Sequence, residues 1–294
     1  MVELDDEKIR KIVRESYGKI ADRNKGYSCC SPSSSSTQTS SSSCCGDVSL
    51  TQNYSSRIGY SEEELRSVPE GANLGLGCGN PTALASIKEG EVVVDLGSGA
   101  GFDCFLAANK VGKSGKVIGI DMTAQMIDSA RENAKKGDYE NIEFRLGEIE
   151  NLPVADNTAD LIISNCVINL SPDKERVFHE AFRVLKSGGR MMISDIVLTE
   201  ELPYLLKQNL EAYVSCVSGA LLKEKYISII QDVGFQNIEI VGESYFPIQY
   251  MITDHNVNEF KDKFNLTPEQ VEEIRNFNGA VISLKVKAFK PNNN

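Results

Sequence analysis

The chain of 294 residues has few of the features that several classes of function require. It contains only two histidines, His179 and His255, so a mechanism in which a histidine removes a proton has little support. It carries 31 lysines and arginines against 42 aspartates and glutamates, a net charge of −11, and it has no basic run that would neutralise phosphates. We therefore expect no nucleic acid and no membrane surface among its partners.

Long apolar segments are also missing. The acidic N-terminal stretch MVELDDEKIRK has no apolar run typical of a secretion signal, and the best membrane candidate, residues 212–222, is too short to cross a bilayer. We expect a cytoplasmic protein. The chain length favours one large domain with a smaller one appended.

Cysteine, in contrast, is abundant for a chain without an export signal. A reducing compartment keeps such residues as thiols, so metal, metalloid or redox chemistry has to be considered. Taken singly, a free cysteine is more often a small buried apolar residue, and we expect Cys104 to be one. The eight positions are Cys29, Cys30, Cys44, Cys45, Cys78, Cys104, Cys166 and Cys216.

Two helix signals precede the main domain. Residues 5–25 carry apolar side chains at three- and four-residue spacing, which predicts an amphipathic helix, and Ser61 with Glu64 predicts a capping box at the start of a short helix.

The middle of the chain alternates short apolar, β-branched runs with helical stretches. The runs span 91–97, 116–121, 142–147, 159–165 and 189–195. This alternation predicts an α/β fold: a doubly wound, mostly parallel, Rossmann-like sheet with helices on both faces. Beyond residue 199, helices and two further strands predict a smaller C-terminal α+β region, in which the alternating run AVISLKVKAF is a half-buried edge strand or part of a separate small sheet.

A glycine-rich turn follows the first predicted strand, in VVVDLGSGAG. The glycines from Gly97 to Gly101 allow close approach to a ligand, and the following helix offers free N–H groups. Asp95 precedes this loop, and Asp121 ends the second strand, where doubly wound folds place an acid on ribose hydroxyls. Two carboxylates around such a loop suit an adenosyl cofactor that carries an amine, which is S-adenosylmethionine.

The segments DLGSGAGFD, GIDMT, GEIENLP and SNCVINLSPDKERVFHEAFRVLKSGGRMMISDIV resemble, in order and spacing, the class I S-adenosylmethionine-dependent methyltransferases over residues 91–198. The resemblance implies that the glycine loop lines the methionine part of the cofactor, that an acid lies near its amine and another on its ribose, and that apolar and acidic residues meet the adenine. Asn165 would lie beside the transferred methyl group. The implied cofactor residues are Asp95, Gly97, Ser98, Gly99, Asp121, Met122, Glu148, Ile149 and Asn165.

The glycines on both sides of Cys78 allow a turn that points its sulfur inward, and the helical spacing and small neighbours around Cys216 would let its thiol project from a helix. Three segments, GLGCGNP, SNCVINL and VSCVSGA, resemble the arsenite S-adenosylmethionine methyltransferase family over about residues 54 to 235. The resemblance implies that Cys78, Cys166 and Cys216 hold trivalent arsenic as a trithiolate. It also implies an additional N-terminal cysteine in turnover, a role for Cys44 or Cys45, with Cys29 and Cys30 as substitutes.

The implied chemistry needs no base and no metal cofactor. The arsenic lone pair attacks the sulfonium methyl, and the arsenic is formally oxidised, so that two electrons must return before the next methylation. A disulfide between Cys78 and Cys44 or Cys45 would supply them and would be reduced by a thioredoxin- or glutathione-type partner. The expected substrate is arsenite or its thiol conjugates, and the expected role is arsenic detoxification.

Two alternatives stay open at this point. One is a small-molecule C- or O-methyltransferase of the quinone-biosynthesis type, and the other is a non-enzymatic, thiol-rich protein that binds metalloids. The domains we expect are an N-terminal helix with a flexible Cys/Ser-rich loop (1–60), a cofactor-binding methyltransferase domain (61–198), a helical metalloid-binding region (199–235) and a small C-terminal α+β domain (236–294).

Overall fold

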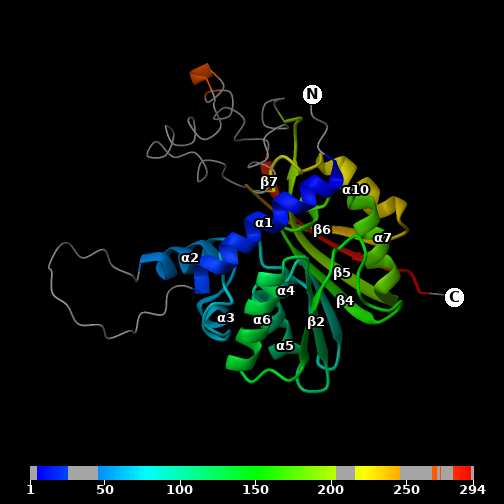
Figure 1. Cartoon of the computed structure of the whole chain (residues 1–294). Coiled ribbons are helices and arrows are strands. Elements are labelled where there is room, and N and C mark those ends of the chain that lie inside the picture. The colour runs from blue at the N-terminus through cyan, green and yellow to red at the C-terminus, as the bar shows by residue number, and fades with distance from the viewer. Residues whose placement is uncertain are drawn as a thin grey trace.

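A computed structural model describes the chain over residues 5–25, 46–202, 216–245, 267–269, 272 and 281–292. Its helices and strands alternate along the chain as the sequence predicts (Figure 1). The elements are α1 (Asp6–Lys25), α2 (Gly46–Arg57), α3 (Glu62–Arg66), α4 (Pro81–Leu84), β1 (Val92–Leu96), α5 (Phe102–Val111), β2 (Lys116–Asp121), α6 (Ala124–Lys136), β3 (Ile142–Leu146), β4 (Ala159–Asn165), η1 (Ile168–Leu170), α7 (Lys174–Val184), β5 (Leu185–Leu198), α10 (Lys223–Asp232), β6 (Gln236–Tyr245) and β7 (Val281–Phe289).

The strands form one sheet in the order β3-β2-β1-β4-β5-β7-β6. The first five are parallel to their neighbours, and β7 runs antiparallel to both β5 and β6. The chain leaves β1 toward one edge of the sheet and returns at β4 on the other side of β1, so the carboxyl ends of β1 and β4 flank a topological switch point.

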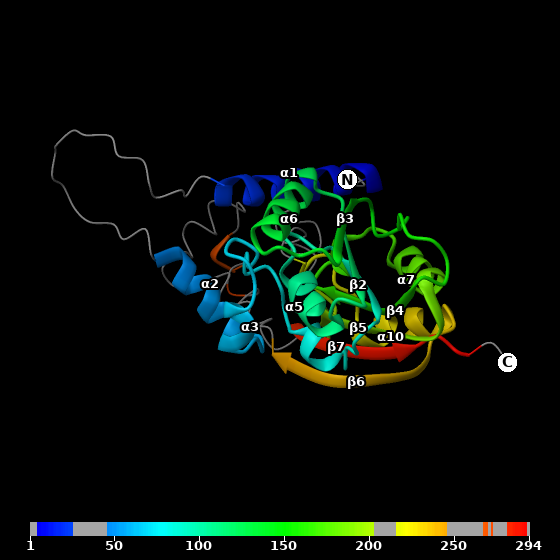
Figure 2. The ribbon, with the colours of Figure 1, turned by 90° about the horizontal axis from the view of Figure 1, so that it is seen from below.

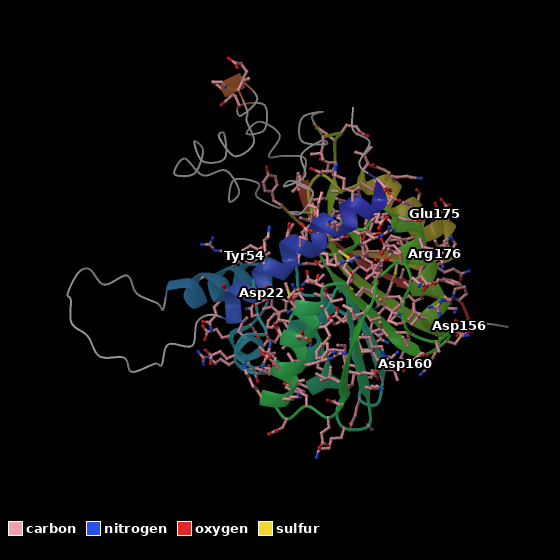
Figure 3. All side chains as sticks on the ribbon, in the orientation of Figure 1. Asp22, Tyr54, Asp156, Asp160, Glu175 and Arg176 are labelled. Atoms are coloured by element: carbon pink, nitrogen blue, oxygen red, sulfur yellow. The ribbon has the colours of Figure 1, made fainter. Side chains whose placement is uncertain are left out.

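Each face of the sheet is covered by helices (Figure 2). Successive residues of a strand point to opposite faces of the sheet, so each strand contributes side chains to the core on both faces. In β4, for example, Leu161 and Ile163 pack with α5 and α6, whereas Ile162 packs with α7 and α10. The predicted doubly wound fold is therefore confirmed. Charged side chains such as Glu175 and Arg176 lie on the exposed side of α7 (Figure 3).

Local signals define the helix starts near the site. Ser61 and Glu64 form the capping box that the sequence predicts for α3. Pro81 opens α4, where the Asn80 side chain accepts a hydrogen bond from the Ala83 N–H. The glycine loop ends at Gly101, whose φ of 98° places it in the left-handed region just before α5.

Two expectations for the C-terminal third are corrected by the structure. Strand β7 is neither an edge strand nor part of a separate sheet, because it lies between β5 and β6 and pairs with both. The division expected at residue 236 therefore does not coincide with a sheet boundary. Cys216, expected to project from a helix, lies in a turn and has a φ of 65°.

Among the described residues, no helix combines the length and apolar character that a bilayer span requires.

Leucine truncation on the sheet tests this packing. Leu161 of β4 has no exposed surface, whereas Leu146 of β3 is 55% exposed. Leu161→Ala should lower the free energy of unfolding by about 2–5 kcal/mol, because a cavity replaces the buried side chain. The matched variant Leu146→Ala should change it by less than about 0.5 kcal/mol in the same urea titration. Equal effects of the two substitutions would contradict the described sheet order.

Candidate active site

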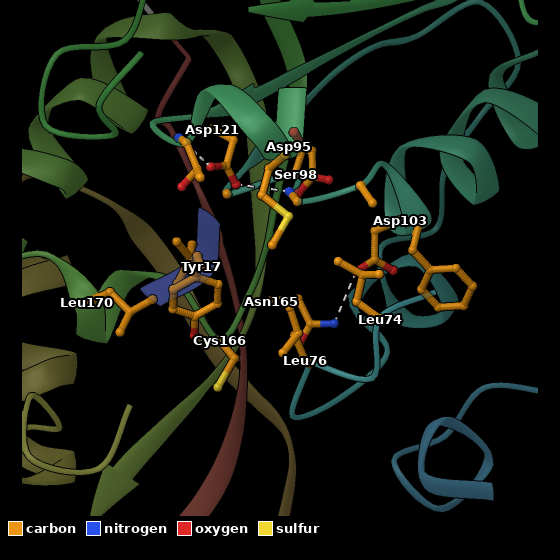
Figure 4. Close-up of a pocket in the computed structure, with 18 of the residues that line it drawn as sticks. Tyr17, Leu74, Leu76, Asp95, Ser98, Asp103, Asp121, Asn165, Cys166 and Leu170 are labelled. Atoms are coloured by element: carbon orange, nitrogen blue, oxygen red, sulfur yellow. Dashed lines mark hydrogen bonds between the residues drawn. The ribbon is translucent and has the colours of Figure 1, made fainter. Parts of the chain in front are cut away.

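A cavity opens at the carboxyl ends of β1, β2 and β4, as expected at the switch point. In Figure 4, Asp95, Ser98 and Asp121 lie along one side of it, and Asn165 and Cys166 lie opposite. Tyr17 and Leu170 lie at one end, and Leu74 and Asp103 at the other. Its wall therefore combines acids, small loop residues and apolar side chains.

The glycine loop closes one wall of the cavity. The N–H groups of Gly97 and Ser98 both donate to the carbonyl of Ile120, at 2.8 and 2.9 Å, which folds the loop back over β2. A Cβ on Gly97 would lie 2.4 Å from the Val167 side chain, whereas a Cβ on Gly99 would meet nothing within 4 Å. The buried Ser98 hydroxyl has no hydrogen-bond partner among the described residues. The loop thus leaves open space and a free polar group for a ligand.

Three aspartates, Asp95, Asp103 and Asp121, contribute carboxyl groups to the wall of this cavity. Burial and the nearby Asp103 hold the pKa of Asp95 well above its usual value, although a hydrogen bond from Cys104 opposes the shift. Burial raises the pKa of Asp103 to about 6, against hydrogen bonds from Asn165 and Tyr60. Burial also raises the pKa of Asp121, whose oxygens accept the N–H groups of Thr123 and Gly99. A cationic ligand would relieve these costs.

These features fit S-adenosylmethionine, which carries both an ammonium and a sulfonium group. The structure brings nearly all of the predicted cofactor residues to the cavity wall. The exception is Glu148, which is not among the lining residues and instead pairs with Arg14 of α1 at 3.2 Å, while its neighbours Gly147, Ile149 and Glu150 face the cavity. The predicted residues that line the cavity are Asp95, Gly97, Ser98, Gly99, Asp121, Met122, Ile149 and Asn165.

Helix α1 covers the cavity, which the sequence did not indicate. Val13 and Tyr17 line it from this helix, and Arg10 is held by Glu150 at 3.3 Å. The periodic apolar positions of α1 predicted a buried face, but no sequence signal named what that face would cover. Tyr17 lines the cavity and packs on the cluster that contains Cys166 and Cys216, and burial, followed by these two cysteines, raises the pKa of its phenol.

The three predicted arsenic ligands, Cys78, Cys166 and Cys216, converge in one buried apolar cluster. Each is less than a tenth exposed, and Cys166 also lines the cofactor cavity. Cys166 contacts both others, since its Sγ lies within 4.8 Å of the Cys78 Sγ and its carbonyl accepts from the Cys216 Sγ. Hydrogen bonds with Cys216 and Cys78, together with burial, raise the pKa of the Cys166 thiol well above its usual value. The structure therefore brings these three residues together.

Backbone conformation directs two of these thiols inward. Cys166 and Cys216 have φ values of 60° and 65°, in the left-handed region that non-glycine residues rarely occupy. The Cys216 Sγ donates to the carbonyl of Cys166 at 3.0 Å, and the Cys166 N–H donates to the carbonyl of Ser194 at 2.8 Å. Such strain persists where the surrounding structure over-determines it, most often at functional sites.

The GLGCGNP loop holds Cys78 against three strands. The N–H of Cys78 donates to Asn165 of β4 at 3.0 Å, and its Sγ lies 3.4 Å from the carbonyl oxygen of Ser194 of β5. The carbonyl of Cys78 accepts a hydrogen bond from the Ser283 hydroxyl of β7 at 2.7 Å. Tyr54 of α2 donates to the carbonyl of Gly77 at 2.9 Å. The glycines permit this close approach, as the sequence suggested.

A buried polar group that the sequence did not reveal lies behind the thiols. Asp195 has an oxygen within 4.8 Å of the Sγ atoms of both Cys78 and Cys166. Its carboxylate accepts hydrogen bonds from Asn169 at 3.0 Å and Tyr226 at 3.1 Å, and burial raises its pKa to about 7. SDIV in the fifth strand was part of the methyltransferase resemblance, but nothing marked its acid as a neighbour of the cysteines.

The remaining predicted residues lie elsewhere. Cys44 and Cys45, expected in turnover, lie outside the described residues, as do Cys29, Cys30 and His255. His179 is exposed on α7, near Glu175. Cys104 is fully buried under the cavity and donates to Asp95 at 3.2 Å, in agreement with its expected place in the core.

The raised pKa of Asp103 predicts how stability depends on pH. Because the folded protein binds this proton more tightly than the unfolded chain, the carboxyl stabilises the fold at low pH, and the stabilisation is lost as the pH rises through about 6. Between pH 4 and pH 7, the wild type should lose about 2 kcal/mol more unfolding free energy than Asp103→Asn. Asp103 also raises the pKa of Asp95, which adds to the difference in the same direction, so parallel pH profiles of the two proteins in urea titrations would contradict this assignment.

Comparison with known proteins agrees with this geometry. A family model described as a methyltransferase domain matches residues 87–234. An arsenite methyltransferase from Halobacterium salinarum is 47% identical over 82% of this chain and 60% of its own length, and one from Aquipseudomonas alcaligenes is 40% identical over 57% of this chain and 50% of its own. The chain thus spans about half to three fifths of the length of these relatives.

The crystal structure of an arsenic(III) S-adenosylmethionine methyltransferase from Chlamydomonas reinhardtii matches with 31% identity and a TM-score of 0.60, over 82% of this chain and 73% of that one. The chain therefore belongs to the methyltransferase domain family and, within it, to the arsenite S-adenosylmethionine methyltransferases.

Proposed function

We propose that this protein transfers the methyl group of S-adenosylmethionine to trivalent arsenic held by Cys78, Cys166 and Cys216. The observation that carries the proposal is that the three buried cysteines share one cluster, in which the Sγ atoms of Cys78 and Cys166 lie within 4.8 Å of each other, and that Cys166 also lines the acid-rich cavity. Soft thiolate ligands suit a thiophilic centre. The relatives named as arsenite methyltransferases support the same substrate.

Loading of arsenite onto the thiols needs no external base. Neighbouring cysteines and burial keep the Cys166 thiol protonated, so its proton is available to a departing hydroxide. Each of three thiols forms one arsenic–sulfur bond and gives its proton to one arsenite hydroxyl, which leaves as water. The product is a neutral trithiolate, which suits the apolar cluster around the thiols better than separate charges would.

The cavity would hold and orient the methyl donor. When bound, S-adenosylmethionine supplies an electrophilic methyl group for the arsenic lone pair. Asp95 and Asp103 would bind its cationic methionine end, Asp121 its ribose, and Met122 and Ile149 its adenine. Holding both reactants on one rigid sheet lowers the entropic part of the barrier, by up to about 7–11 kcal/mol in well-oriented systems. Helix α1, with Val13 and Tyr17, would exclude water from the site.

Turnover requires electrons, since methylation leaves the arsenic formally pentavalent. The sulfur of Cys44 or Cys45 would attack the arsenic-bound sulfur of Cys78 and release its proton. A disulfide forms as the Cys78 sulfur–arsenic bond breaks, and the electron pair of that bond stays on the arsenic, which becomes trivalent again. A dithiol reductant of the thioredoxin or glutathione type would then reopen the disulfide. Support for Cys78 is its place on a glycine-flanked loop, next to the other two ligands.

The activity is tested directly. The purified protein, incubated with arsenite, S-adenosylmethionine and a dithiol, should form methylated arsenicals and S-adenosylhomocysteine in mass spectrometry. A heat-denatured sample is the control. Cofactor binding without any methylated arsenic would overturn the proposal, and methylation of a quinone precursor in its place would favour the C-methyltransferase alternative.

Cysteine substitutions test the ligand set. Cys166→Ser and Cys216→Ser should each weaken arsenite binding by more than about 100-fold, because removal of a ligand costs more than the 10- to 100-fold loss typical of its supporting residues. Cys104→Ser is the matched control, since Cys104 is also fully buried but lies against Asp95. It should bind arsenite like the wild type in calorimetry. Retained affinity in both ligand variants would exclude the trithiolate.

A further inference from the structure

The side chain of Asn165 joins the cofactor cavity to the arsenic site. It lies at the carboxyl end of β4 and lines the cavity. Its Oδ1 accepts the N–H of Cys78 at 3.0 Å. Its Nδ2 lies 3.0 Å from Asp103 Oδ2, 2.9 Å from the Tyr60 hydroxyl and 2.8 Å from the Gly79 carbonyl.

These partners allow only one orientation of the amide. The carboxylate of Asp103 and the carbonyl of Gly79 are acceptors, so both require the NH₂ group of Asn165. The N–H of Cys78 is a donor and requires the amide oxygen. A flipped amide would place oxygen against oxygen at Asp103 and NH₂ against N–H at Cys78. The Tyr60 hydroxyl donates to Asp103 Oδ1 at 2.7 Å and thereby aligns the carboxylate with the amide.

The loop that carries Cys78 packs directly on this amide. A Cβ on Gly77 would lie 2.5 Å from Asn165 Nδ2, and one on Gly79 would lie 2.0 Å from the Ser194 hydroxyl. With no side chain between them, a displacement of the amide reaches the backbone of Cys78 directly. The position of the Cys78 thiol therefore depends on how firmly Asp103 holds Asn165.

We infer that Asn165 is a positioning residue through which cofactor binding and arsenite binding favour each other. The inference rests on the proposed function. A cation bound beside Asp103 fixes the position of its carboxylate, which accepts a hydrogen bond from the NH₂ group of Asn165. The oriented amide then holds the Cys78 N–H and keeps this thiol with Cys166 and Cys216. Since binding free energies are reciprocal, arsenite must tighten cofactor binding by the same factor.

Calorimetry with S-adenosylhomocysteine tests the coupling, because this product retains the cationic amine but transfers no methyl group. The wild type should bind arsenite about 5- to 10-fold more tightly when saturated with S-adenosylhomocysteine, a coupling of ordinary size. Equal arsenite affinities with and without it would overturn this inference and leave the proposed function standing. Failure of the wild type to bind arsenite at all would remove both.

Two variants locate the coupling. Asn165→Ala should bind arsenite with the same affinity whether or not S-adenosylhomocysteine is present. Tyr60→Phe keeps the ring, which packs on Phe102 at 4.8 Å, and should reduce the coupling because Asp103 loses one donor. Tyr139→Phe is the matched control and should keep the full factor. Among the described residues, the Tyr139 hydroxyl donates to the carbonyl of Ser67 and not to Asp103 or Asn165. An undiminished factor in both Tyr60→Phe and Asn165→Ala would show that the coupling bypasses this amide, which overturns the inference.

Discussion

The parallel pairing of β1 with β4 is the constraint on which the site depends. Asp95 pairs with Ile163 and Leu96 with Ser164, so the two strands end side by side. The glycine loop follows the carboxyl end of β1, and Asn165 and Cys166 lie at the carboxyl end of β4. Val167 packs so closely on Gly97 that a Cβ there would lie 2.4 Å away. The cofactor cavity and the thiol cluster therefore share one wall, to which Cys166 and Val167 both contribute.

The parts of the fold with strong local signals were predictable. The apolar runs gave the first four strands to within one residue at each end but only the middle of β5, and the capping box of Ser61 and Glu64 gave the start of α3. The place of β7 was not predictable, because alternation shows that one strand face is buried but does not name the neighbouring strands. Helix α1 illustrates the same limit, since its periodicity marked Val13 and Tyr17 as buried without indicating the cavity beneath them.

The site was predictable from the sequence only in part, because burial alone does not distinguish its cysteines. Cys104 is as buried as Cys78, but it faces Asp95, whereas Cys78 lies near two other thiols. The family resemblance grouped three residues that the structure places in one cluster. It could not give the left-handed backbone conformation of Cys166 and Cys216, nor the acid of Asp195 behind the thiols, because both follow from the path of the chain between distant segments.

The hydrogen bond from the Ser283 hydroxyl to the carbonyl of Cys78 shows that the last strand, β7, supports the thiol site as well as extending the sheet. Ser283 pairs with Ile196 of β5, and this register turns its hydroxyl toward the GLGCGNP loop. A slip of one residue would turn the hydroxyl to the opposite face and bring an isoleucine or a leucine to the loop. An insertion or deletion inside β7 that shifted this pairing would therefore withdraw a support of Cys78, although the strand itself contributes no thiol.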